Sequence, residues 1–178
     1  MPDNTELTVL ISQCHQTLNE IFLRHQEAVL LTRLDDAMAL FGSFKQLHQL
    51  HLDFEDQVLL PKLSTLDNPG RWPESLYKSE HAKIQQLMNR VENSLRPLRT
   101  ARLQDRASRR AIIAILDQQK TFKGVCEHHQ EREEMALLPA LDEQADSEWR
   151  TGVITLFQVA WDGCMERNGN VVSQMDWR

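Results

Sequence analysis

The chain has 178 residues, of which 41% are apolar and 26% are charged, and its formal net charge is −6. This balance is typical of a globular domain and excludes collagen-like, low-complexity and largely disordered chains. The negative charge argues against a general nucleic-acid or anionic-membrane binder, because both need a positive surface. A single Tyr, together with many Leu, Gln, Glu and Ala, favours helix over strand. The composition therefore predicts an all-α protein.

The cysteines and the hydropathy pattern bear on the compartment of the protein. Cys14, Cys126 and Cys164 form no Cys-x-x-Cys pair and leave an odd thiol, so we expect no disulfide framework and a reducing environment. The N-terminus has neither a basic start nor a long apolar core, which argues against a secretory signal. No apolar stretch approaches the roughly 18 residues that a membrane span needs. We therefore expect a cytoplasmic protein that makes no membrane contact.

Apolar residues spaced three and four apart predict four long helices and a shorter fifth. The predicted ranges are about 5–33, 35–63, 73–95, 107–141 and 146–167. Asp35 or Asp36 is expected to cap the second helix, and Asp146 or Ser147 the fifth. An Asn-Pro-Gly sequence at 68–70 predicts the loop before the third helix.

The short connections predict how these helices pack. Four long helices joined by short loops indicate an up-down-up-down four-helix bundle over residues 1–142. Residues 143–178 would then form a C-terminal helix and tail that packs on the bundle or against a second subunit. A homodimer through this helix is one expectation of that arrangement.

An internal repeat gives the first indication of function. The segments HLDFEDQVLLPKL, from His51, and HQEREEMALLPAL, from His129, align without gaps and are identical at six of thirteen positions. Both contain His-x-x-x-Glu followed by Leu-Leu-Pro-x-Leu, and an acidic residue follows the Glu in each copy. A weaker repeat precedes each copy, where His15 and His81 share the pattern His-x-x-Leu/Ile-x-x-Ile/Leu.

The repeated residues have the spacing of metal ligands. Residues four apart lie on one face of a helix, so His51 with Glu55 and His129 with Glu133 each form a pair of ligands, here called a claw. His15 lies on the inward stripe of the first helix, at about the same height as His51 in an antiparallel pair. Six ionisable side chains buried together would be costly without a partner, whereas a pair of metal ions would satisfy them.

Two further residues are alternatives near this cluster. His25 shares the inward stripe of the first helix, but it lies about three turns nearer the loop and Val91 takes its place in the third helix. We therefore favour His15 over His25 as the ligand, and leave open whether His25 supplements it. Cys126 lies about one turn before His129, where we favour a packing role.

Four elements follow one another along the chain: His15, His51-x-x-x-Glu55, His81 and His129-x-x-x-Glu133. This pattern resembles the hemerythrin-like (HHE cation-binding) family over residues 10–142. The resemblance implies a four-helix bundle that holds two non-haem iron ions. It implies that His15 and His51 bind one iron, that His81 and His129 bind the other, and that Glu55 and Glu133 bridge the two. Counting the positions around two six-coordinate irons leaves room for an oxo or hydroxo bridge and about two open positions.

Two differences separate the chain from the oxygen-carrying members of that family. Those proteins have a second histidine one turn after the first in the third helix, where this chain has Gln85, and their last carboxylate is an Asp five residues after its His, where this chain has Glu133 at four. The resemblance therefore points to the bacterial branch that is linked to iron handling and to oxidative or nitrosative stress. The expected small ligands are oxygen, peroxide or nitric oxide. The alternative is an iron- or redox-dependent sensor or interaction module without turnover.

A basic segment lies between the third and fourth helices. It extends from Arg96 to Arg110 and contains six Arg against Asp105. We expect a solvated helix start there, with a patch that binds acidic partners or phosphate as the alternative.

Overall fold

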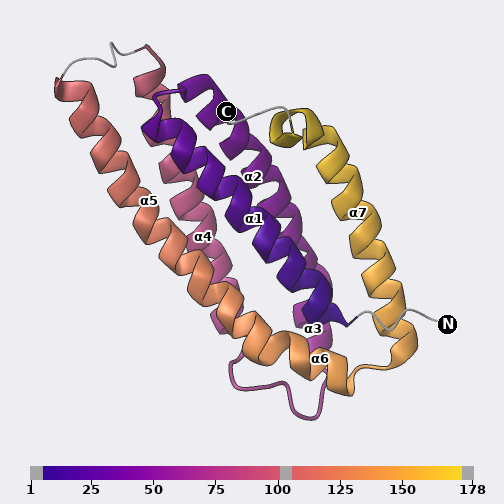
Figure 1. The fold of residues 1–178 in the computed structure, drawn as a ribbon. Coiled ribbons are helices and arrows are strands. Elements are labelled where there is room, and N and C mark those ends of the chain that lie inside the picture. Colours follow the sequence, from indigo (N-terminus) through magenta and orange to yellow (C-terminus); the bar gives the residue numbers. More distant parts are fainter. Residues whose placement is uncertain (1–5, 101–105, 174–178) are drawn as a thin grey trace.

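The computed structural model describes residues 6–100 and 106–173, and over these ranges the chain is all-α without a strand (Figure 1). Five long helices lie within these ranges: α1 (Leu7–Leu30), α2 (Leu34–Phe54), α4 (Glu74–Leu95), α5 (Arg106–Arg132) and α7 (Ser147–Ser173). Two short helices, α3 (Leu60–Leu63) and α6 (Leu138–Gln144), continue α2 and α5. The prediction of an all-α fold is confirmed.

The long helices pack as an antiparallel bundle. Helix α1 packs against α2, α2 against α4, α4 against α5, and α5 against α1, which closes a four-helix core. Helix α7 lies outside this core along α2, with further contacts to α1 (Figure 1). The predicted four-helix bundle with an additional C-terminal helix is therefore present, and the homodimer through that helix stays a prediction. No helix in the described ranges is long and apolar enough to cross a membrane.

Each claw lies where an α-helix widens into a π-helix. The π-helical segments are Glu55–Leu59 and Glu133–Leu137, so the Glu of each claw is the first residue of such a segment. Within them the Leu60 N–H donates to the carbonyl of Glu55, and the Leu138 N–H to that of Glu133, five residues back. The two long helices predicted to be continuous are thus each interrupted by one π turn.

The repeated proline explains the wide turns. Pro61 and Pro139 lack an N–H, and a proline ring inside a regular α-helix clashes with the carbonyl four residues earlier. A π turn relieves that clash without ending the helix, and such turns occur frequently at functional sites. The Leu-Leu-Pro motif of the repeat therefore shapes the backbone immediately after each claw.

Two helix termini differ from the prediction. Helix α2 begins at Leu34. Asp35 and Asp36 do not cap it but lie in its first turn, where their negative charges interact favourably with the positive end of the helix. Helix α7 begins as predicted, because the Asp146 carboxylate accepts from the Trp149 N–H at 2.7 Å. It continues past Arg167 because Asn168 is buried and donates to the Cys164 carbonyl at 2.9 Å.

The basic segment is only partly described. Helix α4 ends at Leu95, and a 3-10 helix follows over Arg96–Thr100, while Arg102 and Asp105 lie outside the described residues. Arg96 is exposed and pairs with Glu92 at 2.9 Å. The three arginines at the start of α5 are also exposed: Arg106, Arg109 and Arg110. These described residues agree with a solvated helix start.

The turn between α1 and α2 contains a strained residue. Thr32 has φ 58, in the left-handed region, where its N–H donates to Val29 at 3.1 Å and the Arg33 N–H donates to Ala28 at 2.9 Å. This is the Schellman pattern of hydrogen bonds, in which Gly is the usual residue because a Cβ is unfavourable there.

We expect Thr32→Gly to raise the free energy of unfolding by about 1 kcal/mol, since relief of the Cβ clash exceeds the entropy cost of Gly. Urea unfolding monitored by circular dichroism measures this change. Thr32→Ala keeps the Cβ and should gain less, and a Gly variant no more stable than the Ala variant would contradict this explanation.

Candidate metal centre

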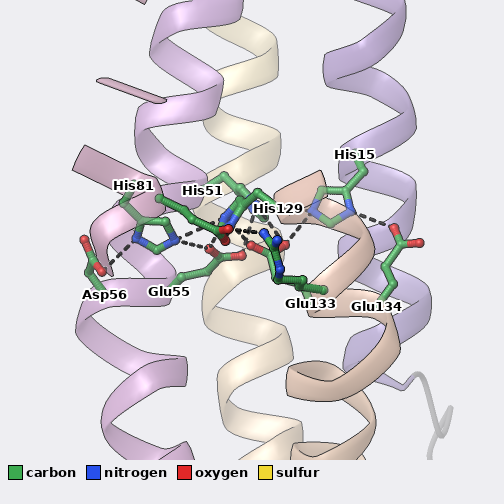
Figure 2. A network of polar contacts seen from close by, with 10 residues as sticks. His15, His51, Glu55, Asp56, His81, His129, Glu133 and Glu134 are labelled. Carbon is green, nitrogen blue, oxygen red and sulfur yellow. Dashed lines mark hydrogen bonds and ion pairs between the residues drawn. The ribbon is translucent and has the colours of Figure 1, made fainter. Parts of the chain in front are cut away.

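Six buried side chains meet between the four core helices (Figure 2). Each is at most 2% exposed. They are His15 from α1, His51 from α2, His81 from α4, His129 from α5, and Glu55 and Glu133 from the two π segments. These are the six residues that the sequence pattern singled out, and the structure brings all of them together. They form two overlapping groups, and in each group one ligand atom per residue lies within 4.8 Å of the others.

The first group contains one imidazole from each of α1 and α2. The Nε2 atoms of His15 and His51 lie 3.3 Å apart. Oε2 of Glu133 lies 3.0 Å from Nε2 of His15 and 3.7 Å from Nε2 of His51. Oε1 of Glu55 lies 3.0 Å from Nε2 of His51. Two imidazole nitrogens and two carboxylate oxygens therefore converge on one point.

The second group repeats this arrangement on α4 and α5. The Nε2 atoms of His81 and His129 lie 3.1 Å apart. Oε2 of Glu55 lies 3.1 Å from Nε2 of His81 and 3.5 Å from Nε2 of His129. Oε1 of Glu133 is also in contact with Nε2 of His129.

Both carboxylates are shared between the two groups. Glu55 directs Oε1 to the first group and Oε2 to the second, whereas Glu133 directs Oε2 to the first and Oε1 to the second. Figure 2 shows the two carboxylates in the middle of the cluster, with His15 and His81 on opposite sides. All four carboxylate oxygens are buried, and their polar neighbours are the imidazole Nε2 atoms of the cluster. Each carboxylate could therefore contact an ion held by either group.

Acidic side chains outside the cluster orient three of the four imidazoles. Nδ1 of His15 donates to Glu134 at 2.7 Å, and Nδ1 of His81 donates to Asp56 at 2.8 Å (Figure 2). Nδ1 of His129 donates to Glu80 at 3.1 Å. An N–H held at Nδ1 leaves the lone pair of Nε2 directed into the cluster, as in metal-binding histidines generally.

The outer contacts cross between the two copies of the repeat. Asp56 follows the claw of the first copy but contacts His81 of the second, and Glu134 follows the claw of the second but contacts His15 of the first. The sequence contained a signal for this pair, because the acidic residue after each claw is part of the repeat. Glu80 carried no such signal, because its position in the first copy is Cys14.

The charges of the cluster shift the pKa values of its members. Burial favours the neutral imidazole of His51, but Glu55 and Glu133 outweigh burial and raise its pKa to about 10. The pKa of His129 is raised well above its ordinary value for the same reasons, with Glu133 as the main partner. Burial opposes ionisation of Glu133, yet His129 holds the pKa of that carboxyl well below its usual range. Protons and metal ions would therefore compete for the same Nε2 atoms.

The donor set fits divalent transition-metal ions. Imidazole nitrogen and carboxylate oxygen are ordinary ligands of such ions. Without protons, only acceptor atoms converge here, and lone pairs packed this closely in a buried site repel one another unless cations lie between them. Two ions would give every inward atom a partner and would balance the two buried carboxylate charges.

Two apolar layers enclose the cluster. On one side lies a group of packed aromatic rings, in which Phe44 lies 5.2 Å from Phe22 and 5.8 Å from Phe122 between ring centroids. On the other side lie the buried leucines of the two Leu-Leu-Pro motifs and their helices: Leu59, Leu60, Leu63, Leu137, Leu138 and Leu141. These layers exclude bulk water from the ligands and strengthen the electrostatic interactions within the cluster.

The neighbouring candidates have other roles in the structure. His25 is buried away from both groups, where Nδ1 donates to the Ala37 carbonyl at 2.8 Å and Nε2 accepts from Gln119 at 2.8 Å. Burial lowers its pKa to about 4, so it stays neutral at pH 7. Cys126 belongs to neither group, and burial raises the pKa of its thiol to about 12, which disfavours the metal-binding thiolate.

Comparison with known proteins finds no relative of this chain. No protein-family model matches the chain, and no curated protein and no solved structure shows significant similarity to it. The sequence repeat and the buried His/Glu cluster are therefore the features that indicate a metal-binding helical protein.

Proposed function

We propose that this chain is a hemerythrin-like non-haem di-iron protein that binds or reacts with oxygen, peroxide or nitric oxide in iron homeostasis or stress defence. The observation that carries the proposal is the pair of buried groups, each with two imidazoles, that share both Glu55 and Glu133. The resemblance of the repeated claws to the hemerythrin-like family supports iron as the metal. The departures at Gln85 and Glu133 favour reaction with small oxidants over oxygen transport.

In this function the side chains hold, orient and shield the ions. The four imidazoles and two carboxylates would bind them, and Asp56, Glu80 and Glu134 would keep three of the rings aligned. A pair of irons supplies reversible one-electron chemistry toward small oxidants. Asp56 and Glu134 are both half-buried, and each accepts a hydrogen bond from Nδ1 of a ligand histidine. They therefore provide a route for protons between the cluster and solvent.

Metal analysis combined with absorption spectroscopy tests the proposal. We expect anaerobic loading with ferrous iron, followed by air, to give two irons per chain and near-ultraviolet bands of an oxo-bridged ferric pair. A chain that binds no iron under these conditions would contradict the proposal. Iron-loaded protein that consumes neither peroxide nor nitric oxide would favour the sensor alternative over reactivity.

Gln85 offers a more specific test of the ligand count. It lies on α4 one turn after His81 and is half-buried, so Gln85→His would add an imidazole on the side of His81. We expect the variant to bind azide more weakly and to consume peroxide more slowly, because fewer positions remain for exogenous ligands. Stopped-flow absorption at full iron loading measures both quantities.

The exposed neighbour Gln86 provides the matched control, since Gln86→His adds the same side chain outside the core. If Gln85→His has the azide affinity and peroxide rate of the parent protein, the position beside His81 is not open.

A further inference from the structure

The four imidazoles of the cluster are not equally supported. His81 and His129 each donate through Nδ1 to a carboxylate, at 2.8 Å to Asp56 and at 3.1 Å to Glu80. In the other group, His15 has such a partner in Glu134, but Nδ1 of His51 is buried and has none. The two groups that could hold an ion therefore share their bridging carboxylates but differ in their outer contacts.

The difference arises where the repeat breaks. Glu80 precedes His81 and pairs with Arg132 as well as with His129. At the corresponding positions of the first copy, Cys14 precedes His15, and Phe54 takes the place of Arg132. The first copy thus has two apolar side chains at these positions. In the second copy the same positions form an ion pair, and its carboxylate, Glu80, also contacts the ligand His129.

Helix α7 explains why the first copy is apolar at these positions. The ring of Phe54 lies 4.5 Å from that of Phe157 of α7, between centroids. Cys14 lies in a groove that Trp161 of the same helix also lines. A carboxylate and a guanidinium there would be buried under α7 and would lose their hydration, whereas Glu80 and Arg132 lie on the side of the bundle away from this helix. Covering the first copy with α7 therefore leaves His51 without an outer partner.

We propose that the two metal positions bind with unequal affinity, the position at His81 and His129 tightly and the position at His15 and His51 weakly. This inference rests on the proposed metal centre and goes beyond it. A carboxylate on Nδ1 fixes the ring and makes Nε2 a stronger donor, and loss of such a contact typically weakens metal binding by about 10–100-fold. Glu80 is thus the positioning residue that makes the two metal affinities unequal. The ion at the weak position, between His15 and His51, is the one that exchanges.

Titration of the metal-free full chain with Co²⁺ tests the inequality, with visible absorption and calorimetry as readouts. We expect two steps of one ion each, separated by about tenfold or more in dissociation constant. His81→Ala should abolish the tight step, and His15→Ala should abolish the weak one. A single step with two equal ions, or a tight step that survives in His81→Ala, would overturn the inequality. A parent chain that binds no Co²⁺ and no Fe²⁺ would instead overturn the metal centre itself.

Variants of the outer carboxylates test the cause of the unequal metal affinities. Glu80→Gln should weaken the tight step about tenfold and leave the weak step unchanged, whereas Glu134→Gln should weaken only the weak step. Glu131→Gln removes an exposed charge from the end of α5 and should change neither step. A weak step altered by Glu80→Gln, or a tight step that it leaves unchanged, would overturn the role of Glu80.

Folding is monitored separately in each variant by circular dichroism and thermal unfolding of the metal-free chain. Arg132→Met provides a second route should Glu80→Gln fail to fold. It leaves Glu80 in place but removes the ion pair that holds it, so a smaller weakening of the same tight step is expected. An unchanged tight step in Arg132→Met would then overturn the positioning role.

Discussion

Glu133→Gln is expected to reduce the metal content from two ions to at most one per chain. Glu133 reaches both groups of ligands, so its loss removes one carboxylate oxygen from each. Binding of an ion at a thousand times its dissociation constant stabilises the folded state by about 4 kcal/mol, and most of this metal-dependent gain should disappear in the variant. Atomic absorption and thermal unfolding with and without metal measure the two effects.

The metal-free form of the same variant should also be less stable than the parent. The protonated imidazoles of His15 and His129 would lose the carboxylate that compensates their charge, and removal of one partner from a buried ion pair costs about 3–5 kcal/mol. Glu131→Gln, at an exposed position of the same helix, is the matched control and should keep its metal and its stability. If Glu133→Gln retains two tightly bound ions, Glu133 does not bridge the pair.

The repeat made the inner residues of the cluster predictable. A His and a Glu four residues apart lie on one helix face whatever the tertiary structure, so each claw follows from local geometry. The position of His15 opposite His51 follows from helix length and from the antiparallel connection. The spacing of apolar residues likewise predicted most termini of the four core helices to within a few residues.

Tertiary contacts decided what local patterns could not. His25 and His15 share one stripe of α1, and only the carbonyl of Ala37 and the side chain of Gln119 show that His25 is satisfied elsewhere. The π turns were missed because one extra residue per turn barely changes an apolar pattern, although the proline that causes each turn is visible in the sequence. Glu80 was missed because it departs from the repeat, and its role depends on which copy α7 covers.

The stability of the metal-free protein is expected to fall as the pH rises from about 6.5 to about 10. The pKa of His51 is about 10 in the folded chain against an ordinary value of 6.5, so the folded state holds a proton that the unfolded chain releases. Its contribution is fully present below the ordinary value and is lost as the pH passes through the raised one. The pKa values of His15 and His129 are raised in the same direction, mainly by Glu133 acting against burial. Thermal unfolding of chelator-treated protein across this range measures the decline.

The carboxylates do not reverse this trend. Burial raises the pKa of Glu55 and Glu133, but the neighbouring histidines outweigh it and hold both well below the usual range. Their contribution is present above the ordinary carboxyl pKa and is lost only in acid, so they stay ionised throughout the alkaline range.

Metal binding should show the opposite pH dependence, because each ion replaces protons at Nε2. At pH 7 we expect loading to release protons from His51, whose pKa is about 10, and from His129, whose pKa is raised well above its ordinary value. Metal affinity should therefore increase with pH, and the difference in melting temperature between loaded and metal-free protein should widen toward pH 10. Calorimetric titrations in buffers of different ionisation enthalpy count the released protons, and His128→Gln, at an exposed position outside the cluster, should leave the count unchanged. A count near zero would mean that the imidazoles are already neutral before metal arrives, and that the two buried carboxylates alone attract the ions.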